Sequence, residues 1–111
     1  MSDNKIEIQV TTDENKVPTE IHWTAPNEKI KGRSAKAMTL VFWDEENTST
    51  MNMDLWTKEM KVDEMKFFMH QSLLTMSDTF ERATGEKEMT LAMKDFCDYF
   101  AEKMDLKPPS L

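Results

Sequence analysis

The sequence predicts an α+β fold in which a four-stranded antiparallel meander is followed by two helices. Apolar and polar residues alternate with a period of two through the first half of the chain, which indicates half-buried strands. From Val62 the apolar period becomes 3.6, which indicates amphipathic helices. The two glycines, Gly32 and Gly85, both fall at predicted connections, so the two signals agree. We expect one domain over residues 1–111, with the sheet at about 4–56, helices at about 62–84 and 86–104, and an extended tail at 105–111.

The strand pattern occurs in four segments, and the connections between most of them are too short for a parallel crossover. The third segment is apolar on both faces, which is typical of a central strand or of one whose outer face meets another subunit. Between the second and third segments, Pro26 and the basic cluster Lys29–Lys36 predict a long loop. We interpret this loop as solvated and not as an anion site, because no aromatic residue neighbours the charges. The four segments are residues 4–12, 17–24, 35–43 and 50–56.

Each predicted helix carries one apolar stripe that we expect to face the core. Asp63 and Glu64 complement the helix dipole in the first turn, and Gly85 suits a left-handed cap. Phe67 and Leu74 widen the apolar surface beyond what one sheet covers, so either the second helix or an oligomer covers the excess. The stripes are Val62, Met65, Met69, Leu73, Met76, Phe80 and Ala83 in the first helix, and Met89, Met93, Phe96, Phe100 and Met104 in the second.

Composition narrows the class of protein. The net charge of −7 is spread over both halves without a basic face, which disfavours nucleic-acid binding. The 11 methionines fill an irregular core or form an adaptable binding surface, and both interpretations stay open. A lone cysteine, Cys97, fits a reducing compartment. No apolar run reaches the roughly 18–20 residues of a membrane span, and the N-terminus lacks a secretory pattern. We therefore expect a cytoplasmic protein without membrane insertion.

No arrangement of residues predicts catalysis, a cofactor or a metal. His22 and His70 stand alone in their elements, without the paired spacing that metal ligands require. Cys97 is expected to be an inert buried thiol, since no histidine lies near it in the sequence. Asp54 lies between apolar residues but is expected to face water. We therefore expect a protein that is not an enzyme, with no catalytic, cofactor-binding or metal-binding residues.

Three segments are the most specific in the chain, DLWTK at 54–58, VDEM at 62–65 and ATG at 83–85, and LVFWD at 40–44 accompanies them. On these residues, nearly the whole chain resembles the gliding-motility protein GldC family of Bacteroidetes. The resemblance implies a small soluble accessory protein of the gliding-motility and type IX secretion apparatus, with no catalytic residues. The order ββββαα also resembles the protomer of the SecB-type secretion chaperones, which are acidic and oligomeric, and this implies a chaperone-like homo-oligomer.

The leading hypothesis is an interaction protein that binds protein partners of the gliding or secretion machinery through apolar surface. We expect the partner-binding residues to be Trp43, Trp56, Phe67 and Leu74, although each of them also suits core packing. The alternative is a small-ligand-binding or enzymatic domain that uses a pocket between the sheet and the first helix.

Overall fold

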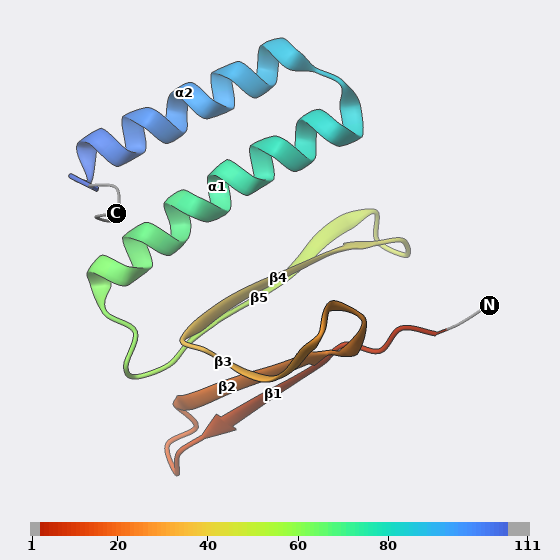
Figure 1. Ribbon diagram of the computed structural model, residues 1–111, viewed down its shortest axis with the longest axis vertical. Helices are drawn as coiled ribbons and strands as arrows, with labels where there is room; N and C mark the ends of the chain where they lie inside the picture. The colour runs from red at the N-terminus through yellow and green to blue at the C-terminus, as the bar shows by residue number, and fades with distance from the viewer. Residues whose placement is uncertain (1–2, 107–111) are drawn as a thin grey trace. The chain divides into compact units, whose positions relative to one another are not determined.

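The computed structural model describes residues 3–106 of the chain, which divides into two compact units (Figure 1). Residues Met1–Met60 form the sheet unit, and Lys61–Leu111 form the helical unit. The expectation of an α+β fold is confirmed, whereas the expectation of a single domain stays a prediction. The predicted C-terminal tail lies outside the described residues from position 107 onward.

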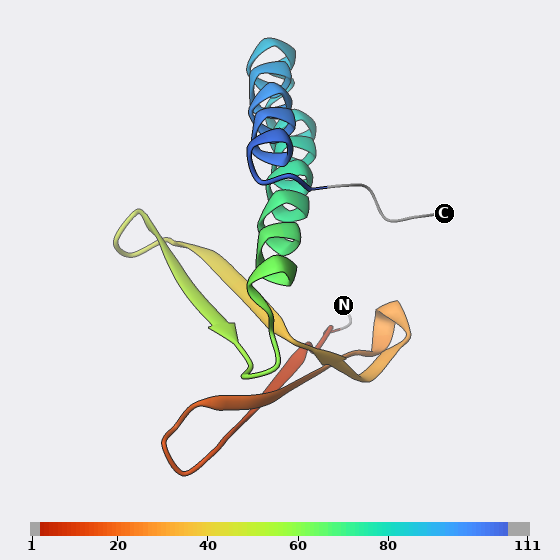
Figure 2. The ribbon, with the colours of Figure 1, turned by 90° about the vertical axis from the view of Figure 1, so that its left-hand side faces the viewer.

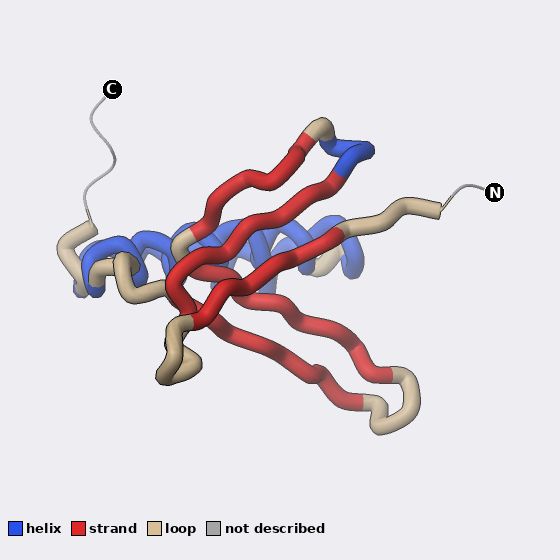
Figure 3. The backbone as a smooth tube through the Cα atoms, turned by 90° about the horizontal axis from the view of Figure 1, so that it is seen from below, coloured by secondary structure: helices blue, strands red, loops and turns tan. Residues whose placement is uncertain are grey.

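The sheet unit contains five strands in two antiparallel sheets (Figure 3). A three-stranded sheet has the order β1-β2-β3, and β4 and β5 form a separate hairpin. The strands are β1 (Glu7–Thr12), β2 (Pro18–Ala25), β3 (Ile30–Ala35), β4 (Ala37–Asp44) and β5 (Ser49–Trp56).

The expectation of a single four-stranded meander is wrong, because the predicted loop at 25–34 contains a strand. A 3-10 turn at Pro26–Glu28 and the left-handed conformation of Lys29 reverse the chain. Strand β3 then returns along β2, with Arg33 opposite Trp23. The basic cluster is therefore the exposed edge of a sheet. Its charges are compatible with a strand because one side of an edge strand meets only water.

Burial in the sheet unit is concentrated at β2, where Ile21 and Ala25 are 2% and 4% exposed. Thr57, just after β5, is hydrogen-bonded to Lys36, the residue that precedes β4. Its backbone N–H and its hydroxyl both donate to the Lys36 carbonyl, at 2.8 and 3.0 Å. The next residue, Lys58, donates its N–H to the Pro18 carbonyl at the start of β2. These bonds fix the base of the β4–β5 hairpin against the three-stranded sheet.

The helical unit is an antiparallel pair of helices, α1 (Val62–Thr84) and α2 (Lys87–Lys103), shown in Figure 2. The predicted bounds of α1 are confirmed, and those of α2 differ by one residue at each end. Gly85 ends α1 in the left-handed conformation with φ 73°, and its N–H donates to the Glu81 carbonyl. At the other end, the Glu64 carboxylate accepts the N–H of Lys61 at 3.0 Å. Neither helix in residues 3–106 has the length and apolar character of a membrane span.

The seam between α1 and α2 is built from small residues. Ser77, Thr90 and Cys97 are 0%, 1% and 1% exposed. Ser77 and Thr90 donate their hydroxyls to carbonyls of their own helices, which leaves no unsatisfied polar group in the seam. The spacing of seven residues from Thr90 to Cys97 matches the heptad repeat of closely packed helices. At one end of the seam His70 stacks on Phe100, with the ring centroids 6.1 Å apart.

Candidate functional site

The β4–β5 hairpin has one face that is apolar along most of its length and ends at the turn in the polar pair Asp44 and Ser49. Eight successive residue pairs join the two strands without a shift of register. Because paired residues share a face, alternate pairs bring six apolar residues together. Phe42, Met51 and Met53 on this face are 60%, 57% and 55% exposed. The hairpin apolar face consists of Met38, Leu40, Phe42, Met51, Met53 and Leu55.

The opposite face of the hairpin carries two of the predicted partner-binding residues, Trp43 and Trp56. They are 65% and 57% exposed. Trp56 pairs with Ala37, six residues before Trp43, so the two indoles lie at opposite ends of the face, about 20 Å apart along the strand. Between them the Asp54 carboxylate accepts hydrogen bonds from the Thr39 hydroxyl and the Asn52 amide. Asp54 is thus exposed, as expected, and is held by polar neighbours.

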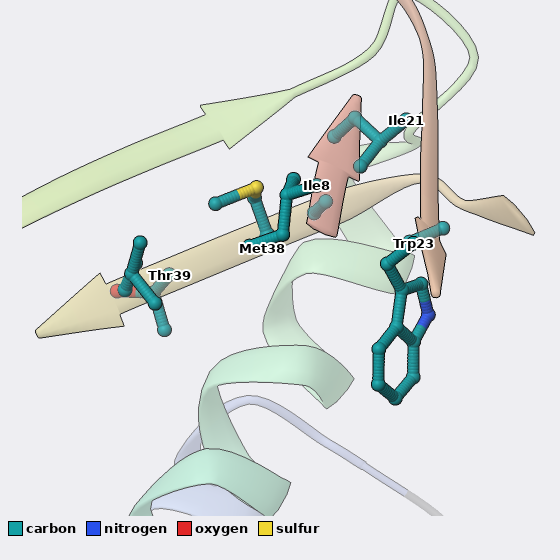
Figure 4. A pocket seen from close by; sticks show the side chains of 8 residues that line it. Ile8, Ile21, Trp23, Met38 and Thr39 are labelled. Atoms are coloured by element: carbon teal, nitrogen blue, oxygen red, sulfur yellow. The ribbon is translucent and has the colours of Figure 1, made fainter. Parts of the chain in front are cut away.

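A cavity of about 270 Å³ lies where β4 leaves the three-stranded sheet (Figure 4). Its lining is apolar except for Thr39, whose hydroxyl is already donated to Asp54. Ligand pockets are usually about 300–1,000 Å³ and contain several convergent polar groups. This cavity is smaller and offers no charged group to orient a substrate. The lining residues are Ile8, Ile21, Trp23, Ala35, Ala37, Met38, Thr39 and Leu40.

The helical unit contains an open apolar groove of about 330 Å³ between α1 and α2, which we call the Met groove. Met76, Met89 and Phe96 are 59%, 56% and 54% exposed along it. Methionine side chains are flexible and polarisable, so a groove lined by them adapts to apolar segments of different shape. The Met groove is lined by Leu73, Met76, Met89, Ala92, Met93, Phe96 and Cys97.

Cys97 lies in the lining of the Met groove. Burial raises the pKa of its thiol, the charge of Asp98 raises it further, and Lys94 acts weakly in the opposite direction. Since the thiolate is the nucleophilic form, a raised pKa makes this side chain an inert apolar contact at neutral pH. The expectation of a buried cysteine is confirmed.

From the sequence, the apolar stripes that contain these residues were expected to face the core, and whether the methionines form a binding surface was left open. The apolar stripes of both helices contain its residues, but the closest packing uses the smaller residues Ser77, Thr90 and Cys97 instead. The predicted residues Phe67 and Leu74 lie outside the groove lining: Phe67 is 36% exposed and Leu74 is half-buried. The available signal was the surplus of methionine on both helices.

His22 lies on β2, where it pairs with Gln9 and Ser34. It lines a polar cleft of about 370 Å³ in the sheet unit, together with Glu20, Lys36 and Glu59. Within residues 3–106, no three His, Cys, Asp or Glu side chains gather closely enough to hold a metal ion.

The chain is thus an α+β protein whose most distinctive surfaces are an apolar hairpin face and a methionine-lined groove. It belongs to the GldC-like family: the family model described as gliding motility-associated protein GldC-like matches residues 18–106. The match includes all of the specific segments and both apolar surfaces, and it begins after β1. No curated protein and no solved structure matches the chain.

Proposed function

We propose that this member of a gliding-motility-associated family is a non-enzymatic cytoplasmic accessory protein that binds apolar segments of protein partners in the Met groove. The observation that carries the proposal is the groove itself, in which Met76, Met89 and Phe96 are each more than half exposed. A helix pair that had only to pack would bury these side chains, because exposing them forgoes about 25 cal/mol for each Å² of apolar surface. The partners belong to the gliding or type IX secretion machinery of Bacteroidetes.

The chemistry of the groove defines the segment that it binds. The lining offers no charged side chain, so it recognises apolar side chains by shape and by dispersion contacts. The chain carries a net charge of −7, which favours partners whose apolar segments are flanked by basic residues. An amphipathic helix lying in the groove is the recognition mode that fits best.

A chaperone-like role, in which the groove holds apolar segments before assembly or secretion, extends this proposal. The likeness to the SecB-type chaperones was drawn from four strands followed by two helices, whereas the chain has five strands in two sheets before its helices. The likeness therefore rests only on the order of strands before helices, and it is an analogy of fold. The alternative of a ligand-binding or enzymatic domain is less well supported, because the apolar cavity at the base of the hairpin is small and lacks orienting groups.

The test compares Met89→Ser with Leu91→Ser. Both residues are on α2 and strongly exposed, at 56% and 63%, but only Met89 lines the groove. In a light-scattering assay with chemically reduced insulin as the unfolded client, the wild type and Leu91→Ser should delay aggregation, and Met89→Ser should lose most of the delay. Equal activity of the two variants, or no delay by the wild type, contradicts the chaperone-like role.

The cellular role is tested by complementation. In a gliding host that lacks this gene, the wild type and Leu91→Ser should restore colony spreading, whereas Met89→Ser should not. Full rescue by Met89→Ser at normal protein level contradicts a role for the groove in gliding.

A further inference from the structure

The β4–β5 hairpin has an open edge along β5. Within residues 3–106, β5 is hydrogen-bonded to β4 and to no other strand. Its residues Ser49 to Asp54 are all exposed. The free edge of a strand presents unpaired N–H and C=O groups, which form a template for another strand.

The three-stranded sheet has features that disfavour pairing of its edges with a further strand, and β5 lacks such features. The β1–β2 ladder shifts register between Thr11 and Thr12, and the β2–β3 ladder shifts near Trp23. Strand β3 also carries exposed positive charges at Lys31 and Arg33. Irregular pairing and charge are the usual means of blunting an edge. Strand β5 has no shift in its ladder, no proline and no lysine.

We propose that β5 pairs antiparallel with β5 of a second copy of this chain, about a twofold axis at Asn52. The pairing converts two two-stranded hairpins into one continuous four-stranded sheet. A lone hairpin is marginally stable in water, whereas three or more strands with an apolar face are stable. The second copy therefore supplies the strands that the hairpin lacks.

The sequence of β5 is self-complementary in this register. Met51 lies opposite Met53 of the second copy, so the hairpin apolar faces join into one surface. Thr50 lies opposite Asp54 of the second copy, which keeps the two carboxylates apart. A slip of one residue sets methionine against the polar face and breaks the match.

Charge is compatible with β5 as the place where two copies meet. Each chain has a net charge of −7, so contacts between copies are disfavoured where carboxylates are dense. The only charged residue of β5 is Asp54, and its carboxylate already accepts hydrogen bonds from Thr39 and Asn52. The edge of β5 is thus nearly free of repulsion.

The first test measures molar mass by size-exclusion chromatography with light scattering. Met53 and Val41 are both 55% exposed, but only Met53 lies on the pairing strand. At tens of micromolar, which populates a dimer with a Kd of about 1 µM, wild type and Val41→Lys should have twice the 13.0 kDa chain mass. Met53→Lys should fall to one chain mass with unchanged circular dichroism. A monomeric wild type, or a dimer that survives Met53→Lys, overturns the proposal.

The second test is a disulfide at the proposed axis. In a Cys97→Ser background, Asn52→Cys places two thiols on directly opposed residues, about 4.5–5.5 Å apart at Cα, which a disulfide can span. Mild oxidation should give a covalent dimer at least tenfold faster than for Leu91→Cys, a control at another exposed position, on α2. Equal rates overturn the pairing at Asn52.

The β5 edge shares no residue with the Met groove, so a result that contradicts pairing at β5 leaves the proposal for the groove intact, and the reverse also holds. Met89→Ser should still form the dimer, and Met53→Lys should still delay the aggregation of the unfolded client. If the helical unit of the same chain or a foreign protein occupied the β5 edge, the purified wild type would be monomeric and the proposal would be wrong.

Discussion

Ile21→Ala tests whether the sheet unit is organised around β2. Ile21 is 2% exposed and is the only large apolar side chain of this unit, within residues 3–60, that is fully buried. Loss of a buried isoleucine to alanine costs about 2–5 kcal/mol, and the cost is highest where the surroundings cannot relax. Ile21 lines both the apolar cavity and the polar cleft, so its packing is incomplete on two sides. We therefore expect a loss at the lower end, about 2–3 kcal/mol.

Urea unfolding followed by tryptophan fluorescence measures this loss, since all three tryptophans lie in the sheet unit. With a denaturant slope of about 1 kcal/mol per M for a unit of this size, the midpoint should fall by about 2–3 M. Ile6→Ala is the matched control, because Ile6 is 67% exposed and should change stability by less than about 0.5 kcal/mol. A loss below about 1 kcal/mol for Ile21→Ala, or equal losses in the two variants, would refute the assignment of the core.

Three further variants test local features of the fold. Thr57→Val removes the hydroxyl that donates to the Lys36 carbonyl and leaves the backbone bond, so the same assay should show a loss of about 0.5–1.5 kcal/mol. Gly85→Ala places a side chain at φ 73°, and thermal unfolding followed at 222 nm should show a loss of about 1–2 kcal/mol; no loss would contradict the left-handed cap. The ammonium of Lys58 and the N–H of Val17 hold the pKa of Asp13 below its ordinary value of 3.8, so this carboxylate stabilises the fold above the unfolded pKa. That contribution is lost as the pH falls through the folded pKa, and between about pH 5 and pH 2.5 the wild type should lose more stability than Asp13→Asn; parallel pH profiles would contradict the ion pair.

The elements with a single clear period were predictable from the sequence. Helix α1 begins at Val62, where the apolar period changes, and ends beside Gly85, which can adopt the left-handed conformation. The faces of β4 and β5 also follow the alternation, because Leu40 and Met53 pair as the pattern requires.

The remaining features depend on tertiary context. Strand β3 was missed because Lys31, Gly32 and Arg33 have the composition of a loop, and only pairing with β2 makes them a strand. The helix seam was missed because hydrophobic periodicity ranks residues by apolar character and not by size. Ser77 and Thr90 occupy the seam since small side chains allow the helix backbones to approach closely.

The Met groove could not be predicted for the same reason as the seam, because hydrophobic periodicity does not take the size of side chains into account. The stripes that contain Met76 and Met89 are the expected contact between the helices, and the sequence offers no sign that smaller residues take that place. Among the predicted partner-binding residues, Trp43 and Trp56 share one face of the hairpin, and their role stays a prediction.

The most direct test of the central claim is methyl NMR of the protein labelled at its methionine methyl groups. On titration with a synthetic amphipathic peptide of leucine and lysine, the resonances of Met76, Met89 and Met93 should shift, while those of Met51 and Met53 on the hairpin should not. The shifts should disappear in Met89→Ser and persist in Leu91→Ser. Binding that shifts only the hairpin methionines, or no shift at all, would contradict the claim that the Met groove is the partner-binding site.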